Sequence, residues 1–88
     1  MLGRNVWAGR YEIDLVLRRG RRVVFCEVKS KTGERHGDPL EMVGPEKLRR
    51  LQEAAAAWLA SHPELHALEL SFEVVAAQGR RLERVAAL

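Results

Sequence analysis

The sequence contains a single cysteine, Cys26, which excludes a disulfide within one chain and favours a reducing compartment. No apolar run approaches the roughly 18–20 residues that a helix needs to cross a bilayer, and no signal peptide opens the chain. Gly-rich phosphate loops and nucleophilic-serine motifs are absent as well. We therefore expect a cytoplasmic protein that has no membrane partner and lacks the common nucleotide-binding motifs.

The chain has 88 residues, 47% of them hydrophobic and 31% charged, which is typical of one globular domain over residues 1–88. Its net charge of +3 is unevenly distributed. Residues 1–50 hold twelve Lys and Arg against seven Asp and Glu, whereas residues 51–88 hold three against five. The basic half would attract a polyanion such as nucleic acid. A merely solvated basic surface is the common alternative.

Hydrophobic periodicity predicts the order β-β-β-α-β-β, and therefore an α/β domain with a mixed sheet and one packed helix. A helix is expected from Pro45 to His62-Pro63, after a long loop over residues 30–44. Strands are expected at residues 1–7, 11–17, 23–28, 68–76 and 81–88. The last of these segments could instead form a short terminal helix.

Alternation within two of the strands predicts which side chains share a face. The residues expected on one face of the second strand are Tyr11, Ile13, Leu15 and Leu17. Those expected toward the core from the fourth strand are Leu68, Leu70, Phe72 and Val74. Val23 to Val28 is nearly continuous in apolar residues, so we expect that strand to be covered on both sides.

The second and third strands carry charges that strands normally lack, at Asp14 and at Glu27-Val28-Lys29. A hairpin loop over residues 19–22, or a tighter one at Gly20-Arg21, gives opposed residues a constant sum of positions, 41, and places Asp14 directly opposite Glu27. A loop at Arg19-Gly20 would lower the sum to 39 and place the two carboxylates diagonally, still on one face. Lys29 shares the face of Glu27, because strand side chains alternate with a period of two. A three-residue loop would separate the two carboxylates onto opposite faces.

Opposed carboxylates destabilise a sheet, and burying them unpaired costs still more. A divalent cation removes both penalties, and hard oxygen ligands suit Mg²⁺ or Mn²⁺. Lys29 could then orient or help deprotonate a water and stabilise charge on an attacked phosphate. The alternative is a salt-bridged Glu27–Lys29 pair on an exposed strand face, with Asp14 solvated.

The pattern Asp14…Glu27-Val28-Lys29 resembles the PD-(D/E)XK signature of restriction-endonuclease-like nucleases. A longer set of residues resembles the bacterial YraN family of predicted endonucleases, which are similar to archaeal Holliday-junction resolvases. The segments that carry this resemblance are 2–5, 12–16, 24–31, 37–39, Lys47, and Ala54-Ala55 with Trp58-Leu59.

The resemblance implies a restriction-endonuclease-like fold, with Asp14, Glu27 and the main-chain carbonyl of Val28 as metal ligands and Lys29 as catalytic base or electrostatic stabiliser. Glu12 would be an outer contact of the metal or a solvated strand residue. Family members usually begin with a helix that carries a further metal-binding Glu, and that helix is expected to be missing here. Tyr11 stands where the family has Gly.

Seven basic residues are candidates for nucleic-acid contact. They are Arg18, Arg19, Arg21 and Arg22 in the hairpin turn, Lys31 after the third strand, and Lys47 and Arg50 near the start of the helix. Cys26 and Trp58 are expected in the core, and His36 at the surface. A zinc site at His62 and His66 is not expected, because Pro63 breaks the helix between them.

The sequence thus predicts a Mg²⁺- or Mn²⁺-dependent endodeoxyribonuclease that hydrolyses DNA phosphodiesters, with branched DNA as a possible substrate and a homodimer as the expected assembly. One alternative is a nucleic-acid-binding module with impaired catalysis. The other is an interaction subunit of a larger complex.

Overall fold

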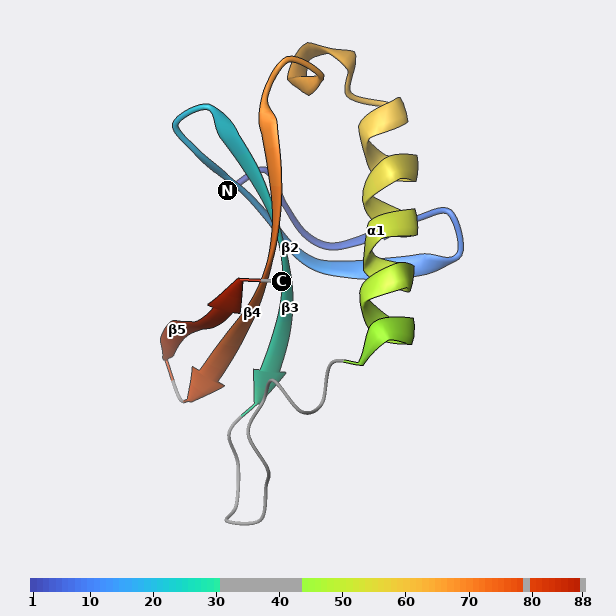
Figure 1. Ribbon diagram of the computed structural model, residues 1–88. Coiled ribbons are helices and arrows are strands. Elements are labelled where there is room, and N and C mark those ends of the chain that lie inside the picture. Colours follow the sequence, from blue (N-terminus) through green and yellow to red (C-terminus); the bar gives the residue numbers. More distant parts are fainter. Residues whose placement is uncertain (31–43, 79, 88) are drawn as a thin grey trace.

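The structure is a computed structural model that describes residues 1–30, 44–78 and 80–87 (Figure 1). Its strands are β1 (Gly3–Ala8), β2 (Tyr11–Arg19), β3 (Arg22–Ser30), β4 (Glu69–Gln78) and β5 (Arg81–Ala87). Between β3 and β4 come helix α1 (Pro45–Ala60) and the short 3-10 helix η2 (Pro63–Leu65). The predicted order is confirmed, and the last segment is a strand. Most of the expected loop over residues 30–44 lies outside the described residues.

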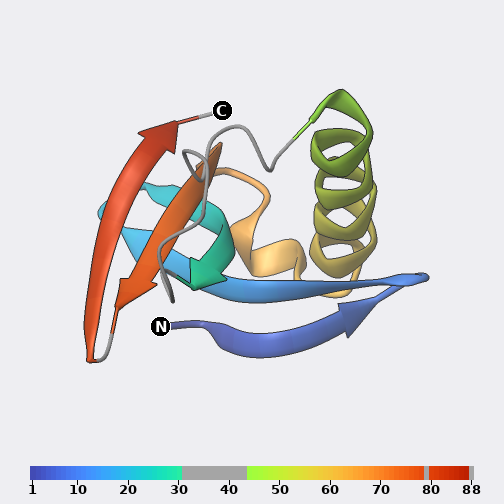
Figure 2. The same cartoon turned by 90° about the horizontal axis from the view of Figure 1, so that it is seen from below.

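The strands form one mixed sheet in the order β1-β2-β3-β4-β5, which confirms the α/β class. Only β3 and β4 are parallel, and the connection between them passes through α1. A parallel pair requires such a crossover, whereas antiparallel neighbours can be joined by hairpins. Seen from below, the β1–β2 hairpin extends beneath α1, which lies beside the sheet (Figure 2). No helix in the described part of the chain is long and apolar enough to span a bilayer.

The β2–β3 hairpin has the predicted register. Arg19 pairs with Arg22, and Arg18 with Val23, so the loop is Gly20-Arg21. Gly20 adopts a φ of 60°, a left-handed conformation that glycine reaches without steric cost. The constant sum of 41 is therefore confirmed for the paired part of the hairpin.

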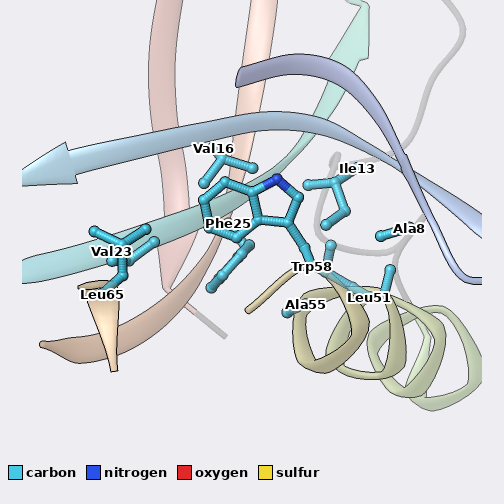
Figure 3. Packing of buried hydrophobic residues seen from close by; sticks show 10 residues of the cluster. Ala8, Ile13, Val16, Val23, Phe25, Leu51, Ala55, Trp58 and Leu65 are labelled. Carbon is cyan, nitrogen blue, oxygen red and sulfur yellow. The ribbon is translucent and has the colours of Figure 1, made fainter. Parts of the chain in front are cut away.

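The main core lies between α1 and the sheet (Figure 3). Phe25 on β3 contacts Trp58 edge-on, with ring centroids 5.9 Å apart, and stacks on Phe72 at 5.5 Å. Ile13 and Val16 of β2 pack against the same cluster. Trp58 is thus a core residue, as predicted, and it anchors the helix to the centre of the sheet.

A smaller apolar cluster involves Leu15, Val24, Cys26 and Val75. Because Val23 and Phe25 belong to the main core and Val24 and Cys26 to this one, β3 is buried on both faces, as predicted. Burial raises the pKa of the Cys26 thiol to about 11, and the nearby charge of Glu73 adds to the effect. Cys26 is confirmed as a core residue with an unreactive thiol.

One prediction about facing and one about burial are wrong. Leu15 and Leu17 do not share a face with Tyr11 and Ile13, because they pack in the smaller cluster while the other two contact the main core. The alternation changes at Asp14, where the strand pairing is interrupted. Leu70 is 46% exposed, because the last turn of α1 and η2 leave an apolar hollow of about 330 Å³ beside it.

Replacing Trp58 by alanine should lower the free energy of unfolding by about 3–5 kcal/mol, because it removes the edge-on contact with Phe25 and leaves a cavity. The matched control is Gln52→Ala on the exposed side of the same helix, which should change stability by less than about 0.5 kcal/mol. Urea unfolding followed by far-UV circular dichroism measures both. Equal effects of the two substitutions would contradict this description of the core.

Candidate functional site

Asp14 occupies a break in the sheet. Of the nine residues of β2, all of which the structure describes, Asp14 alone lacks a Cα partner on both neighbouring strands. Pairing with β1 skips from Leu15 to Ile13, and pairing with β3 ends at Leu15 and Cys26. Beyond that point β2 and β3 diverge, and the site lies in the fork between them.

The Asp14 carboxylate takes over one backbone hydrogen bond in this fork. The N–H of Val28 donates to Asp14 Oδ2 at 2.8 Å. In a continued ladder with the same register, Val28 would face Ile13. The side chain of Asp14 therefore satisfies a backbone donor that the diverging strands leave without a backbone partner, and this bond fixes the carboxylate next to β3.

The pKa of Asp14 is raised above its ordinary value, first by burial and then by the negative charges of Glu27 and Glu12. The hydrogen bond from Val28 acts in the opposite direction. Repulsion from Glu27 requires the two carboxylates to lie close together, as the register predicts. Holding the two carboxylates close together costs free energy, and a bound cation would remove this cost.

Glu27 is held by two ammonium groups. Its Oε1 lies 3.1 Å from Lys29 Nζ and 3.3 Å from Lys47 Nζ. The side chains of Glu27 and Lys29 are only 15% and 14% exposed, so they do not form the exposed surface pair that was the alternative. The pKa of Lys47 is raised, first by the neighbouring amine of Lys29 and then, against the effect of burial, by the charge of Glu27.

These groups surround a hollow of about 230 Å³ between β2, β3 and the first turns of α1. Its lining residues are Tyr11, Glu12, Asp14, Glu27, Lys47, Arg50 and Leu51. The structure thus brings together the predicted Asp14, Glu27 and Lys47, with Glu12 and Arg50 at the margin. Lys29 contacts Glu27 from the same face of β3.

The arginines of the hairpin turn lie elsewhere. The turn is five residues along the strands from Asp14 and Glu27, or about 17 Å, and Figure 1 places it at the opposite end of the hairpin from the end of β3. Arg19 forms a two-fold ion pair with the buried Glu73, and Arg22 pairs with Glu69. Both hold β4 to the hairpin. Lys31 lies outside the described residues, as does His36.

Two residues of the hollow were not predicted as part of the site. The guanidinium of Arg50 lies over the ring of Tyr11, with its Cζ 5.7 Å from the ring centroid. Leu51 lines the hollow with an apolar side chain. Tyr11 had a sequence signal, since it stands where the resembled family has Gly. His62 Nδ1 and His66 Nε2 each form a hydrogen bond with a backbone carbonyl of α1, those of Trp58 and Leu59 respectively.

The donor set fits Mg²⁺ or Mn²⁺. Among the residues that the structure describes, no group of three His, Cys, Asp or Glu side chains forms a ready-made metal cluster. Asp14 and Glu27 nevertheless offer two carboxylates to one hollow, with the main chain of Val28 beside them. Mg²⁺ commonly uses one or two carboxylates and keeps several waters, so this set is sufficient to hold it.

The raised pKa of Asp14 predicts how stability depends on pH without metal. The folded state favours the protonated form of Asp14. The protonated carboxyl therefore contributes to folding stability below the unfolded pKa of about 3.9, and this contribution is lost as pH rises through the folded pKa. In EDTA at pH 7, Asp14→Asn should therefore be more stable than wild type, by no more than about 1 kcal/mol for a half-buried group. Asparagine keeps an oxygen for the Val28 N–H.

The advantage of Asp14→Asn should shrink as pH falls toward 4, and urea unfolding at several pH values measures it. Glu64→Gln, an exposed change on η2, is the matched control and should show no such trend. A variant that is less stable than wild type at every pH would contradict the assignment of repulsion to the carboxylate pair.

Comparison with known proteins places the chain in a family. The model of "Uncharacterised protein family UPF0102" matches residues 1–77. A UPF0102 protein of Frankia casuarinae is 41% identical over 75 residues, which cover 85% of this chain and 63% of the relative. One of Frankia alni is 44% identical over 75 residues, covering 85% and 62%. One of Mycolicibacterium vanbaalenii is 43% identical over 83 residues, covering 92% and 67%. The chain spans about three fifths of the length of the two Frankia relatives. It belongs to the UPF0102 family, which is the YraN-like family that its sequence resembles.

Proposed function

We propose that this protein is a Mg²⁺- or Mn²⁺-dependent endonuclease that hydrolyses phosphodiester bonds in DNA. The observation that carries the proposal is the convergence of Asp14, Glu27 and Lys29 in the fork between β2 and β3. An ion pair that only stabilises the fold, such as Glu27 with Lys29, does not require the second carboxylate of Asp14 beside it. A desolvated carboxylate pair beside an amine is typical of sites for metal-assisted phosphoryl chemistry.

Each residue would have a distinct part in the reaction. Asp14 and Glu27, with the main-chain carbonyl of Val28, would hold the cation. A bound Mg²⁺ supplies Lewis-acid chemistry at the phosphodiester and lowers the pKa of water. Lys29 is oriented by Glu27 at 3.1 Å, so its Nζ can stabilise negative charge that develops on the attacked phosphate or take part in proton transfer. Lys47 and Arg50 would contact the DNA backbone at the rim of the hollow.

Nicking of supercoiled plasmid and of a four-way junction in Mg²⁺ or Mn²⁺ tests the proposal. We expect Glu27→Gln and Lys29→Ala each to lower the cleavage rate by at least about 100-fold, because each removes a group that acts on the transition state. Glu64→Gln should cleave at the wild-type rate. Cleavage that persists in EDTA, or survives Glu27→Gln, would contradict the proposed site.

A second candidate is a nucleic-acid-binding module that does not cleave. It is favoured by the finding that, within the described residues, no three His, Cys, Asp or Glu side chains are grouped to hold a metal ion together, although Glu12 lines the hollow with Asp14 and Glu27. The same assays separate the two functions, because the binding module would retard DNA in a salt-dependent manner and leave every substrate intact.

We also propose that the protein forms a homodimer through β1. This strand is at the edge of the sheet, and Met1, Leu2 and Trp7 are exposed there, Trp7 by 71%. Open edges with apolar side chains favour pairing with another chain. Trp7→Ser should weaken self-association by roughly 30-fold, the effect of losing about 2 kcal/mol at an interface tryptophan. Sedimentation velocity measures it, and a monomeric wild type at high micromolar concentration would contradict the proposal.

A further inference from the structure

The strand β1 is distorted where it passes Asp14. Asn5 has a φ of 52°, and no other residue except glycine has a positive φ in the described part of the chain. Its neighbours pair normally, Arg4 with Leu15 and Val6 with Ile13, but the pair of Asn5 with Asp14 is missing. Asparagine tolerates the left-handed region better than most residues, yet the conformation still costs energy. The distortion therefore coincides with the break in the sheet at the proposed site.

The distortion opens a second hollow, of about 350 Å³, which is lined by Arg4, Asn5, Asp14, Leu15 and Val28. Leu15 and Val28 belong to the smaller apolar cluster, so this hollow differs from the one formed with α1. Asp14 lines both hollows. Because β2 and β3 diverge beyond Leu15 and Cys26, a ligand that enters the fork can reach groups of both.

The polar groups of the second hollow suit an anion. Arg4 is exposed and forms no ion pair with another described residue, whereas Arg19, Arg22 and Arg49 all do. A guanidinium and a side-chain amide together donate several hydrogen bonds in directions that match phosphate oxygens. A second cation is disfavoured here by the charge of Arg4, so the two hollows are chemically different although they share Asp14.

We propose that Arg4 and Asn5 form a phosphate subsite that binds a phosphodiester neighbouring the one cleaved, and so set the position of the DNA strand relative to Asp14 and Glu27. This inference rests on the proposed action on DNA. It assigns a function to the strained conformation of Asn5, which lines this hollow beside Arg4 at the point where the pairing of β1 is interrupted. Arg4 and Asn5 are positioning residues and do not take part in the chemical step.

Fluorescence anisotropy with a labelled 20-base-pair duplex, in EDTA and at several salt concentrations, tests the subsite. Arg4→Gln should weaken binding about 5- to 20-fold and reduce the salt dependence by about one phosphate contact. Arg4→Lys should restore part of the affinity. Arg80→Gln is the matched control, because it removes the same charge at an exposed position that lines neither hollow and is not among the candidate DNA contacts, and it should have a smaller effect.

Asn5→Gly separates binding from folding. Glycine adopts a φ near 52° freely, so the fold and its stability should be retained while binding falls at least about 3-fold. The affinity of Arg4→Gln and Asn5→Gly for Mn²⁺, measured by calorimetry, should stay within twofold of wild type. A substitution that disrupted the whole site would lower this affinity as well.

The outcomes distinguish the subsite from the nuclease proposal. DNA binding that depends on Arg4 without any cleavage by wild type would support the subsite and overturn the nuclease. Cleavage by wild type with unchanged affinity and KM in both variants would support the nuclease and overturn the subsite.

Discussion

The hydrogen bond from the Val28 N–H to Asp14 Oδ2 is the interaction on which the site depends. A sheet that continued its ladder past Leu15 and Cys26 would leave no fork and no room for a ligand. Diverging strands would in turn leave the Val28 N–H without a backbone acceptor at a partly buried position. The carboxylate of Asp14 resolves this conflict, because it accepts the hydrogen bond of the Val28 N–H through Oδ2. The same contact lies where the regular sheet ends and positions the carboxylate that we propose as a metal ligand.

The charges around the fork are arranged in two parts. Glu27 is neutralised within the fold by Lys29 and Lys47, which hold its orientation. Asp14 accepts the backbone hydrogen bond of Val28, and its pKa is raised first by burial and then by the neighbouring carboxylates. In the proposed metal site, a cation would therefore be attracted most by Asp14, whereas Glu27 would be a second ligand already held in place by the two lysines. The ion pair between half-exposed Arg19 and buried Glu73, at the other end of the hairpin, has a separate, structural role.

The sequence predicted the element order, the register of the β2–β3 hairpin and the meeting of Asp14 with Glu27, because a tight loop at Gly20-Arg21 fixes all opposed pairs at once. It did not predict the change of facing between Ile13 and Leu15, since strict alternation assumes an unbroken strand. It also did not predict that Lys47 reaches Glu27, which depends on how α1 packs on the sheet through Trp58. The alternation of residues and the hairpin loop determine which strand residues pair, whereas the candidate site lies where that pairing is interrupted, at Asp14.

Calorimetric titration of Mg²⁺ and Mn²⁺ into wild type, Asp14→Ala and Glu27→Ala tests the central claim most directly. The account predicts saturable binding to wild type that each substitution abolishes, with both variants folded by circular dichroism. Absence of binding to wild type, or binding that survives both substitutions, would contradict a metal centre in the fork between β2 and β3.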